Sequence, residues 1–222
     1  MSHMIVAIIP AFNEEDSIGS VLEAVKKQVD AIIVVDDGSD DTTAEVARTH
    51  GVYTLVHEIN RGQGAALQTG HEYARKLGAE YVVHFDADGQ FVPEEIPLAL
   101  AALESSGADI LFGSRFLGKK GDLPFTKRYI VHPISRGINF LFGTPNMSDA
   151  HNGFRILSKK ALLALDIEQD RMAHATEIPV QVKKKGLGYI EFPVTVRYFE
   201  YGQNVKAGVR ILKDLFLGQF IR

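Results

Sequence analysis

The chain has 222 residues, of which 45% are hydrophobic, and a formal net charge of -4 at pH 7. This length can bury a substantial core, and we expect one large domain. A nucleic-acid partner is not expected, because neutralising phosphates needs clustered Lys and Arg and no long basic run occurs. The absence of cysteine excludes disulfides and thiolate metal sites. No apolar run reaches the ~20 residues that cross a bilayer, and the amino terminus lacks a secretion signal, so we expect a cytoplasmic protein.

Strand-like and helix-like patterns alternate through the first half of the chain. In chain order they predict a strand at residues 4–9, a helix at 16–28, a strand at 31–35, a helix at 42–49, a strand at 53–57, a helix at 64–77, a strand at 81–85, a helix at 93–105 and a strand at 109–113. Asp16-Ser17 and Asp40-Asp41-Thr42 supply N-cap residues for two of the helices. The alternation predicts right-handed crossovers and a doubly wound, mostly parallel α/β sheet with flanking helices.

The second half of the chain is less regular. It predicts a helix at 125–142 that Pro133 bends or splits, a strand at 153–157, a short helix at 158–165 and, because it carries Pro193, an edge strand at 189–198. We interpret residues 1–4 as an expression remnant and residues 5–202 as a single domain. We expect residues 203–222 to form an amphipathic helical segment, whose apolar face would suit a membrane interface and would suit packing on the core or on a second subunit almost as well.

Carboxylates follow directly after two of the predicted strands. Asp36 and Asp37 end the strand at 31–35, and Asp86 and Asp88 end the strand at 81–85. In open α/β sheets ligands bind beyond the carboxyl ends of the strands, so these acids are expected to face one crevice. Like charges repel, and a bound cation or a ribose that needs hydrogen-bond acceptors would explain why they gather there.

The strongest metal signal is Asp86-Ala87-Asp88-Gly89-Gln90. Two carboxylates at positions i and i+2 can reach one hard cation, and Mg²⁺ or Mn²⁺ would take its other oxygens from water and a diphosphate. A calcium-binding EF-hand is excluded because the glycine falls too early in the loop. A plain Asp-Gly hairpin turn is the structural alternative.

Two further turns are candidates for nucleotide binding. Pro10-Ala11-Phe12-Asn13-Glu14 leads from a strand into a helix and can bracket a base, although helix capping explains Asn13 and Glu14 equally well. We expect Asp37 to contact ribose or base, with turn formation as the alternative. Arg61-Gly62-Gln63-Gly64 is not a dinucleotide fingerprint, because Leu67 stands where the third glycine belongs. It predicts a tight turn into a closely packed helix, whose start can also approach a diphosphate.

These motifs in this order resemble the family 2 nucleotide-sugar glycosyltransferases, which have the Rossmann-like GT-A fold. The motifs are residues 10–14, 34–40, 62–66, 86–90 and Gly113-Ser114-Arg115. Asp149-Ala150-His151-Asn152-Gly153-Phe154-Arg155 is similar to the branch that glycosylates polyprenyl phosphates, of which dolichyl-phosphate mannose synthase is the best-known type. The resemblance covers about Ile5 to Lys206 and implies that residues 5–202 form a GT-A catalytic domain.

The resemblance also implies roles for individual residues. Pro10, Ala11, Asn13 and Glu14 would line the base, Asp37 would hold base or ribose, and Asp86 and Asp88 would serve the metal and ribose with Gln90 nearby; Arg115 and Arg136 would face phosphate, Asp149 the sugar or the attacking group, and Arg197 and Lys206 the diphosphate. Gln63 departs from the lysine of many relatives, which leaves the sugar and the nucleotide open. Residues 201–206 match the family's Gly-x-Ser-Lys only loosely.

Transfer from a nucleoside diphosphate sugar requires the charge of the leaving diphosphate to be neutralised, by a divalent cation and by Arg or Lys. A phosphate monoester acceptor, with its second pKa near ~6, is already anionic and attacks without a strong base. Arg115, Arg136 and Arg128 would hold it, and we expect inversion at the anomeric carbon. If the acceptor is a saccharide hydroxyl, Asp149 or Glu177 is the candidate base. The alternative for Glu177 is the start of a helix capped by Thr176.

Two other functions compete with this interpretation. A nucleotidyltransferase would need a glycine-rich basic loop, which residues 10–16 lack. A non-catalytic nucleotide-sugar binding subunit would keep the donor half of the site alone. The expected partners are a nucleoside diphosphate sugar, a polyprenyl phosphate and the inner face of the cell membrane, reached peripherally or through a separate membrane subunit, with a homo-oligomer left open.

Overall fold

The computed structural model describes residues 3–117 and 147–197. The predicted helix at 125–142, the amphipathic segment at 203–222 and the candidate residues Arg128, Arg136 and Lys206 lie outside the described residues. The proposed division of the chain at residues 5, 202 and 203 therefore stays a prediction.

Strands and helices alternate in the first half of the chain as predicted. They are β1 (Ile5–Ala11), α1 (Ile18–Val25), β2 (Ala31–Asp36), α2 (Thr43–Thr49), β3 (Tyr53–Val56), α3 (Gln63–Leu77), β4 (Tyr81–His84), the short 3₁₀ helix η1 (Pro93–Glu95), α4 (Ile96–Ser106) and β5 (Ile110–Ser114). The second described part contains β6 (Arg155–Ser158), α6 (Lys159–Ala164), α7 (His174–Lys184) and β7 (Tyr189–Pro193).

The strands form one seven-stranded sheet in the order β3-β2-β1-β4-β6-β5-β7. All pairs between β3, β2, β1 and β4 are parallel, as is the pair of β5 with β7. β6 runs antiparallel to both of its neighbours, β4 and β5. The mostly parallel sheet is thus confirmed, and so is the edge position of the strand that ends at Pro193, where a residue without an N–H is tolerated.

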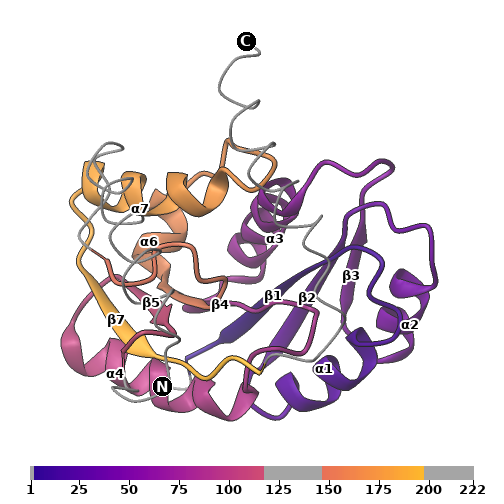
Figure 1. The fold of residues 1–222 in the computed structure, drawn as a ribbon, viewed down its shortest axis with the longest axis horizontal. Helices are drawn as coiled ribbons and strands as arrows, with labels where there is room; N and C mark the ends of the chain where they lie inside the picture. Colours follow the sequence, from indigo (N-terminus) through magenta and orange to yellow (C-terminus); the bar gives the residue numbers. More distant parts are fainter. Residues whose placement is uncertain (1–2, 118–146, 198–222) are drawn as a thin grey trace, which may run out of the picture.

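Helices cover both faces of the sheet, so the molecule has three layers (Figure 1). One face packs under α3, α6 and α7, and the other under α1, α2 and α4. The strands in the middle of the sheet are buried on both sides, which is why they are nearly continuous apolar runs rather than alternating ones. The carboxyl ends of β1, β2, β3 and β4 open toward the same rim of the molecule, because these four strands are parallel.

The predicted helix caps are not formed as expected. Ser17 occupies the N-cap position of α1, but its hydroxyl donates to Glu14 instead of accepting from the helix. Thr42 makes no side-chain cap for α2; Asp41 accepts from the N–H of Thr43 at 2.9 Å in its place. A tight turn over residues 14–17, closed by N–H groups that donate to the Glu14 carbonyl, also makes α1 start two residues later than predicted.

Candidate active site

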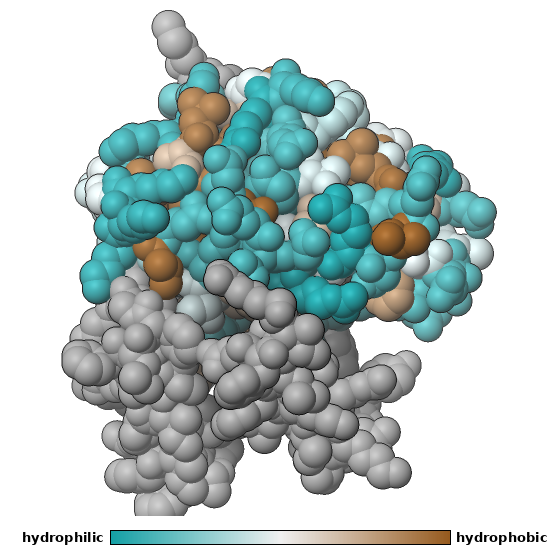
Figure 2. Space-filling view, turned by 90° about the horizontal axis from the view of Figure 1, so that it is seen from above, coloured by the Kyte–Doolittle hydropathy of each residue, from teal (hydrophilic) through white to brown (hydrophobic). Residues whose placement is uncertain are grey.

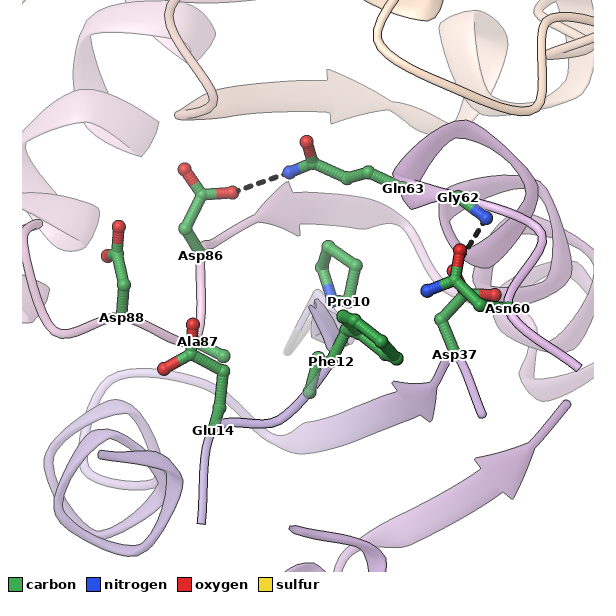
Figure 3. A pocket seen from close by; sticks show the side chains of 11 residues that line it. Pro10, Phe12, Glu14, Asp37, Asn60, Gly62, Gln63, Asp86, Ala87 and Asp88 are labelled. Carbon is green, nitrogen blue, oxygen red and sulfur yellow. Dashed lines mark hydrogen bonds between the residues drawn. The ribbon is translucent and has the colours of Figure 1, made fainter. Parts of the chain in front are cut away.

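A pocket of about 340 Å³ opens at the carboxyl ends of β1, β2 and β4 (Figure 3). This is the edge at which open α/β sheets bind their ligands. The predicted residues that line it are Pro10, Ala11, Glu14, Asp37, Gln63, Asp86 and Asp88. The pocket is completed by residues without a predicted role, namely Phe12, Asn60, Gly62 and Ala87.

The acidic side chains divide between two sides of the pocket. Glu14, Asp86 and Asp88 lie on one side and Asp37 on the other, with the apolar Pro10 between them (Figure 3). Burial and the neighbouring Asp88 carboxylate raise the pKa of Asp86 to about 6, and Glu14 adds to the effect. This side of the pocket therefore carries like charges that a cation would stabilise.

The position of the Asp86 carboxylate is set from two directions. Gln63 Nε2 donates to Asp86 Oδ1 at 2.9 Å. The other oxygen, Oδ2, lies over Gly153, where a Cβ atom would overlap with it. The antiparallel register explains this contact: His84 is opposite Arg155, so Asp86 and Gly153 are the next facing positions beyond the paired strands. The Asp86 carboxylate occupies the space that a side chain at position 153 would fill.

The turn after Asp86 is joined through its backbone to the segment that carries Arg197, a residue that does not itself line the pocket. Asp88 Oδ1 accepts from the Gln90 N–H at 3.0 Å, and the Gln90 carbonyl accepts from the Arg197 N–H at 2.8 Å. Phe91 and Val196 form a β-bridge beside this bond. The chain passes from this turn into η1 and α4, so the hairpin alternative for residues 86–90 is wrong.

Asp37 is buried and organises the opposite side of the pocket. Its Oδ1 accepts from His57 Nδ1 at 2.7 Å and from the Arg61 N–H at 3.0 Å, and its Oδ2 accepts from the Gly62 N–H at 2.5 Å. The carboxylate thereby ties the loop after β3 to the end of β2. Asp37 lines the pocket and at the same time holds the loop that supplies Asn60 and Gly62.

Asn13 has a different position from its neighbour Glu14. Its backbone is left-handed, with φ 56°, and its side-chain oxygen accepts from the Asp40 N–H at 2.9 Å. The Asn13 side chain therefore folds back on the turn after β2, whereas Glu14 lines the pocket. This hydrogen bond is not a helix cap, so the side chain of Asn13 neither caps a helix nor lines the pocket.

The start of α3 is covered by protein backbone. The Ala65 N–H donates to the Asp170 carbonyl at 3.0 Å. A Cβ on Gly62 would lie 2.6 Å from the same carbonyl, and a Cβ on Gly64 would overlap with the carbonyl of Gln169. The two glycines thus make room for residues 169–170. The Ala65 N–H therefore has a protein acceptor, whereas Gly62 and Gln63 line the pocket, and the approach of this helix start to a diphosphate stays a prediction.

Arg115 and Asp149, predicted separately, form one ion pair. Arg115 Nε donates to Asp149 Oδ2 at 2.7 Å, and Arg115 Nη2 donates to Oδ1 at 2.8 Å. The Arg115 N–H and the Asn152 side chain also donate to Oδ2, at 3.1 Å and 3.3 Å. Asp149 is buried. We expected the Arg115 guanidinium to hold a phosphate. Its Nε and Nη2 instead donate to the Asp149 carboxylate.

The structure does not bring Glu177 into the pocket. Its Oε1 accepts from the Glu168 N–H and its Oε2 from the Gln169 N–H, both at 3.0 Å. Capping by Thr176 is also wrong, because α7 begins at His174 and Thr176 lies inside it. Both carboxylate oxygens of Glu177 are engaged by the segment that precedes the helix.

Comparison with known proteins identifies the family. Residues 6–165 match the description Glycosyl transferase family 2. A UDP-N-acetylglucosamine–dolichyl-phosphate N-acetylglucosaminyltransferase of Methanococcus voltae is 32% identical, over 96% of this chain and 95% of that protein. The chain belongs to glycosyl transferase family 2. It is therefore a glycosyltransferase, as the motifs predicted.

Further relatives agree with this assignment. The undecaprenyl-phosphate mannosyltransferase of Micrococcus luteus is 28% identical to this glycosyltransferase, over 92% of this chain and 88% of that protein. Glucosyl-3-phosphoglycerate synthase from Mycobacterium tuberculosis, solved with Mn²⁺, UDP and glucosyl-3-phosphoglycerate, has a TM-score of 0.71 at 20% identity and covers 93% of this chain and 75% of that chain. The predicted GT-A fold and the resemblance to polyprenyl-phosphate glycosyltransferases are confirmed.

The glycosyltransferase also has a buried arginine, Arg155, for which the sequence predicted no role. Arg155 of β6 is 1% exposed, and its Nε and Nη2 have no hydrogen-bond partner among the described residues. It faces His84 of β4, whose Nε2 lies 2.7 Å from Nε2 of His71. Burial lowers the pKa of His71 to about 3, so this pair is neutral. Arg155 lowers the pKa of Asp86 and partly opposes the effect of burial.

The pKa of Asp86 gives a prediction for the glycosyltransferase without metal. Its folded-state value of about 6 lies above the ordinary value of 3.8, so folding favours the protonated form. That contribution to stability is complete below pH 3.8 and is lost as the pH rises through about 6. We expect Asp86→Asn, which keeps the oxygen that accepts from Gln63, to be more stable than the unsubstituted protein at about pH 7.5, by on the order of 1–3 kcal/mol.

Urea unfolding in EDTA measures this difference. The gain is expected at about pH 7.5 and should nearly vanish at about pH 4, where both proteins carry a neutral group at this position. Adding Mn²⁺ should stabilise the unsubstituted protein and leave the variant unchanged. An equal stability difference at both pH values would contradict the prediction.

Proposed function

We propose that this glycosyltransferase moves a sugar from a nucleoside diphosphate sugar to a polyprenyl phosphate, with inversion at the anomeric carbon and with Mg²⁺ or Mn²⁺ as cofactor. One observation carries the proposal. Asp86 and Asp88 line the same pocket as the ends of β1 and β2, so a metal-binding side and a nucleotide-binding side meet in one cavity.

The residues present suit a hard divalent cation. Asp86 and Asp88 offer carboxylate oxygens, the ligands that Mg²⁺ and Mn²⁺ prefer. Burial raises the pKa of Asp86 most, and Asp88 and Glu14 raise it further through negative charge that a cation would offset. In the described ranges no group of three or more His, Cys, Asp or Glu side chains is placed to hold a metal. The bound ion would neutralise charge on the leaving diphosphate.

The donor nucleotide is assigned to the other side of the pocket. Pro10 and Ala11 at the end of β1 and the ring of Phe12, which is 43% exposed, offer an apolar surface for a base. Asp37 and Asn60 add polar groups at the position of the ribose. Mn²⁺ and UDP are bound together in the synthase of Mycobacterium tuberculosis with the same fold, which supports this arrangement.

The polar contacts favour a phosphate acceptor over a saccharide hydroxyl. A hydroxyl needs a carboxylate base with an accessible oxygen. Asp149 has both oxygens on Arg115, and Glu177 has both oxygens on backbone N–H groups. A phosphate monoester needs no such base, and the relatives from Methanococcus voltae and Micrococcus luteus are named for dolichyl and undecaprenyl phosphate. Asp149 then orients Arg115, whose charge helps to hold the phosphate.

The proposed acceptor places the protein at a membrane surface. No helix within residues 3–117 and 147–197 is long and apolar enough to cross a bilayer. The surface over α3, α6 and α7 is mostly hydrophilic, with scattered apolar side chains (Figure 2). We therefore propose peripheral contact at the inner face, made by residues 203–222 or by a membrane subunit. Arg136, Arg197 and Lys206 remain proposed ligands of phosphate groups.

A two-step experiment tests the proposed function. Thermal shift with UDP, GDP, dTDP and CDP sugars, each with Mg²⁺ or Mn²⁺, should show stabilisation by one nucleotide class that depends on the metal. That donor should then transfer its sugar to a short polyprenyl phosphate, giving a β-linked product from an α-linked donor. Retained stereochemistry contradicts the mechanism. Release of pyrophosphate identifies a nucleotidyltransferase, and binding without transfer or hydrolysis identifies a binding subunit.

A further inference from the structure

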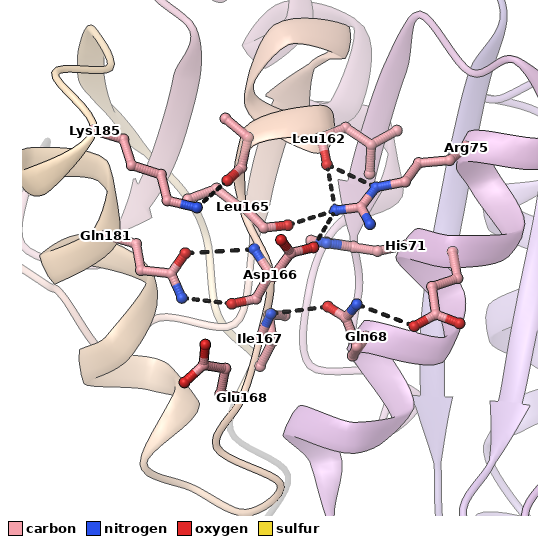
Figure 4. A network of polar contacts seen from close by, with 12 residues as sticks. Gln68, His71, Arg75, Leu162, Leu165, Asp166, Ile167, Glu168, Gln181 and Lys185 are labelled. Atoms are coloured by element: carbon pink, nitrogen blue, oxygen red, sulfur yellow. Dashed lines mark hydrogen bonds and ion pairs between the residues drawn. The ribbon is translucent and has the colours of Figure 1, made fainter.

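Residues 165–171, which we call the strap, lie between α6 and α7, and the first part of the strap runs beside α3 (Figure 4). The second part lies against the start of α3. The first part of the strap is held by two side chains of α3 and by Gln181 of α7, which bonds to the backbone of Asp166. Arg75 Nη2 donates to the Leu165 carbonyl at 2.6 Å and to Asp166 Oδ1 at 2.9 Å. Gln68 Oε1 accepts from the Ile167 N–H at 2.8 Å. Arg75 and Gln68 come from α3, so this part of the strap runs along the body of that helix and is also tied to α7.

The second part of the strap depends on Glu177. Its two oxygens accept the N–H groups of Glu168 and Gln169, each at 3.0 Å. Gln181 Nε2 donates to Glu177 Oε1 at 3.0 Å and keeps the carboxylate in place. Hydrogen bonds from two successive backbone N–H groups to one carboxylate fix the direction of the backbone at these residues. The negative charge of the carboxylate makes these hydrogen bonds stronger than those to a neutral acceptor.

The same part of the strap touches the donor pocket. Its Gln169 and Asp170 carbonyls lie against Gly64 and Gly62, and the Ala65 N–H donates to the Asp170 carbonyl at 3.0 Å. Gln63, between these glycines, is the residue whose amide donates to Asp86 Oδ1 at 2.9 Å. A continuous series of contacts therefore runs from α7 to a proposed metal ligand.

We infer that Glu177 is a positioning residue of the donor pocket, which holds the strap on the two glycines and so fixes Gln63 against Asp86. The carboxylate does not touch the pocket itself and acts through the strap. This deepens the proposed function and rests on it where donor binding is concerned. The effect on the α3 start depends on the protein alone and can be measured without any ligand.

Two variants and one matched control test the inference. Glu177→Ala removes both acceptors of the strap, and Glu177→Gln keeps one and is the milder change. Gln68→Ala removes the acceptor of the Ile167 N–H, which belongs to the same strap but not to the part that lies on the glycines. Urea unfolding of all three gives the general loss of stability, against which the local effects are compared.

Hydrogen exchange of the metal-free protein gives the first measurement. In Glu177→Ala the Ala65 amide should exchange at least about tenfold faster, beyond what its change in global stability explains, because its acceptor is no longer held. In Gln68→Ala the Ala65 amide should follow global stability. Unchanged exchange of Ala65 in Glu177→Ala overturns the inference, whether or not the protein binds a nucleotide.

Binding and turnover give the second measurement. With UDP and Mn²⁺ as the probe, or the nucleotide that the donor panel selects, the Kd should rise about tenfold in Glu177→Ala and less in Glu177→Gln, while kcat falls by less than tenfold. A loss of kcat of about a thousandfold or more with an unchanged Kd would show a catalytic base instead. A lower unfolding midpoint alone would show a purely structural role. If the unsubstituted protein binds none of the nucleotides, the proposed function fails, and the exchange measurement still decides the role of Glu177.

Discussion

Asp88→Asn is expected to lower kcat/KM for sugar transfer by about a thousandfold or more, which corresponds to about 4 kcal/mol of lost transition-state stabilisation. Asp88 lines the pocket beside Asp86, and its Oδ1 accepts from the Gln90 N–H at 3.0 Å. Asparagine keeps this hydrogen bond and the shape of the turn. It removes the negative charge, without which the metal ion is held weakly and the leaving diphosphate is not neutralised.

The variant should remain folded, because the substitution removes a carboxylate that repels the charged form of Asp86. Initial rates at saturating Mn²⁺, together with the Kd for Mn²⁺ in the presence of nucleotide, measure the effect. Glu94→Gln is the matched control, since Glu94 is an exposed carboxylate on the connection that follows the same turn. Transfer by Asp88→Asn within tenfold of the unsubstituted enzyme would rule out the proposed metal site.

Gly153→Ala is expected to lower kcat/KM by about a hundredfold or more, although only one methyl group is added. The backbone of Gly153 is not in the left-handed region, so alanine causes no conformational strain there. Its Cβ would overlap with Asp86 Oδ2, and the end of the Asp86 side chain is the part that can move. The carboxylate would turn away from Gln63, and a metal ligand displaced by about 1 Å is poorly placed for catalysis.

This prediction separates a displaced ligand from a misfolded protein. Gly188→Ala is the control, because its nearest neighbours lie 3.5–3.8 Å from the new Cβ, an ordinary contact distance. Both variants should unfold cooperatively, but Gly153→Ala alone should bind Mn²⁺ about tenfold or more weakly. Full activity and full Mn²⁺ affinity of Gly153→Ala would show that the Asp86 carboxylate tolerates another position and is not the ligand we propose.

Local patterns were sufficient for much of the fold and for one side of the site. β1 to β5 and their helices follow the predicted order, because buried β-branched runs and amphipathic periods are properties of short segments. Asp86 and Asp88 are neighbours in sequence and extend from one strand end, so their meeting in one pocket required only the parallel sheet. The same rule predicted that Pro10, Ala11 and Asp37, at the ends of β1 and β2, would line this pocket.

Contacts between distant segments could not be predicted in this way. Asn60 has no motif of its own and reaches the pocket because Asp37 holds the loop after β3. The antiparallel insertion of β6 between β4 and β5 places Gly153 against Asp86, although the sequence shows only a glycine at the start of a predicted strand. Arg115 follows β5 and Asp149 precedes β6, so their ion pair also depends on the antiparallel pairing of these two strands.

The sequence by itself therefore determined the strand-helix alternation, the family and the carboxylates that follow β2 and β4, because each of these features is recognised from short runs of neighbouring residues. Only the tertiary structure decided how those groups are used. It placed backbone carbonyls on Gly62 and Gly64 and engaged the oxygens of Glu177 with backbone N–H groups. A carboxylate or a glycine has the same local pattern whether its neighbour is a ligand or another segment, and packing across the chain decides between them.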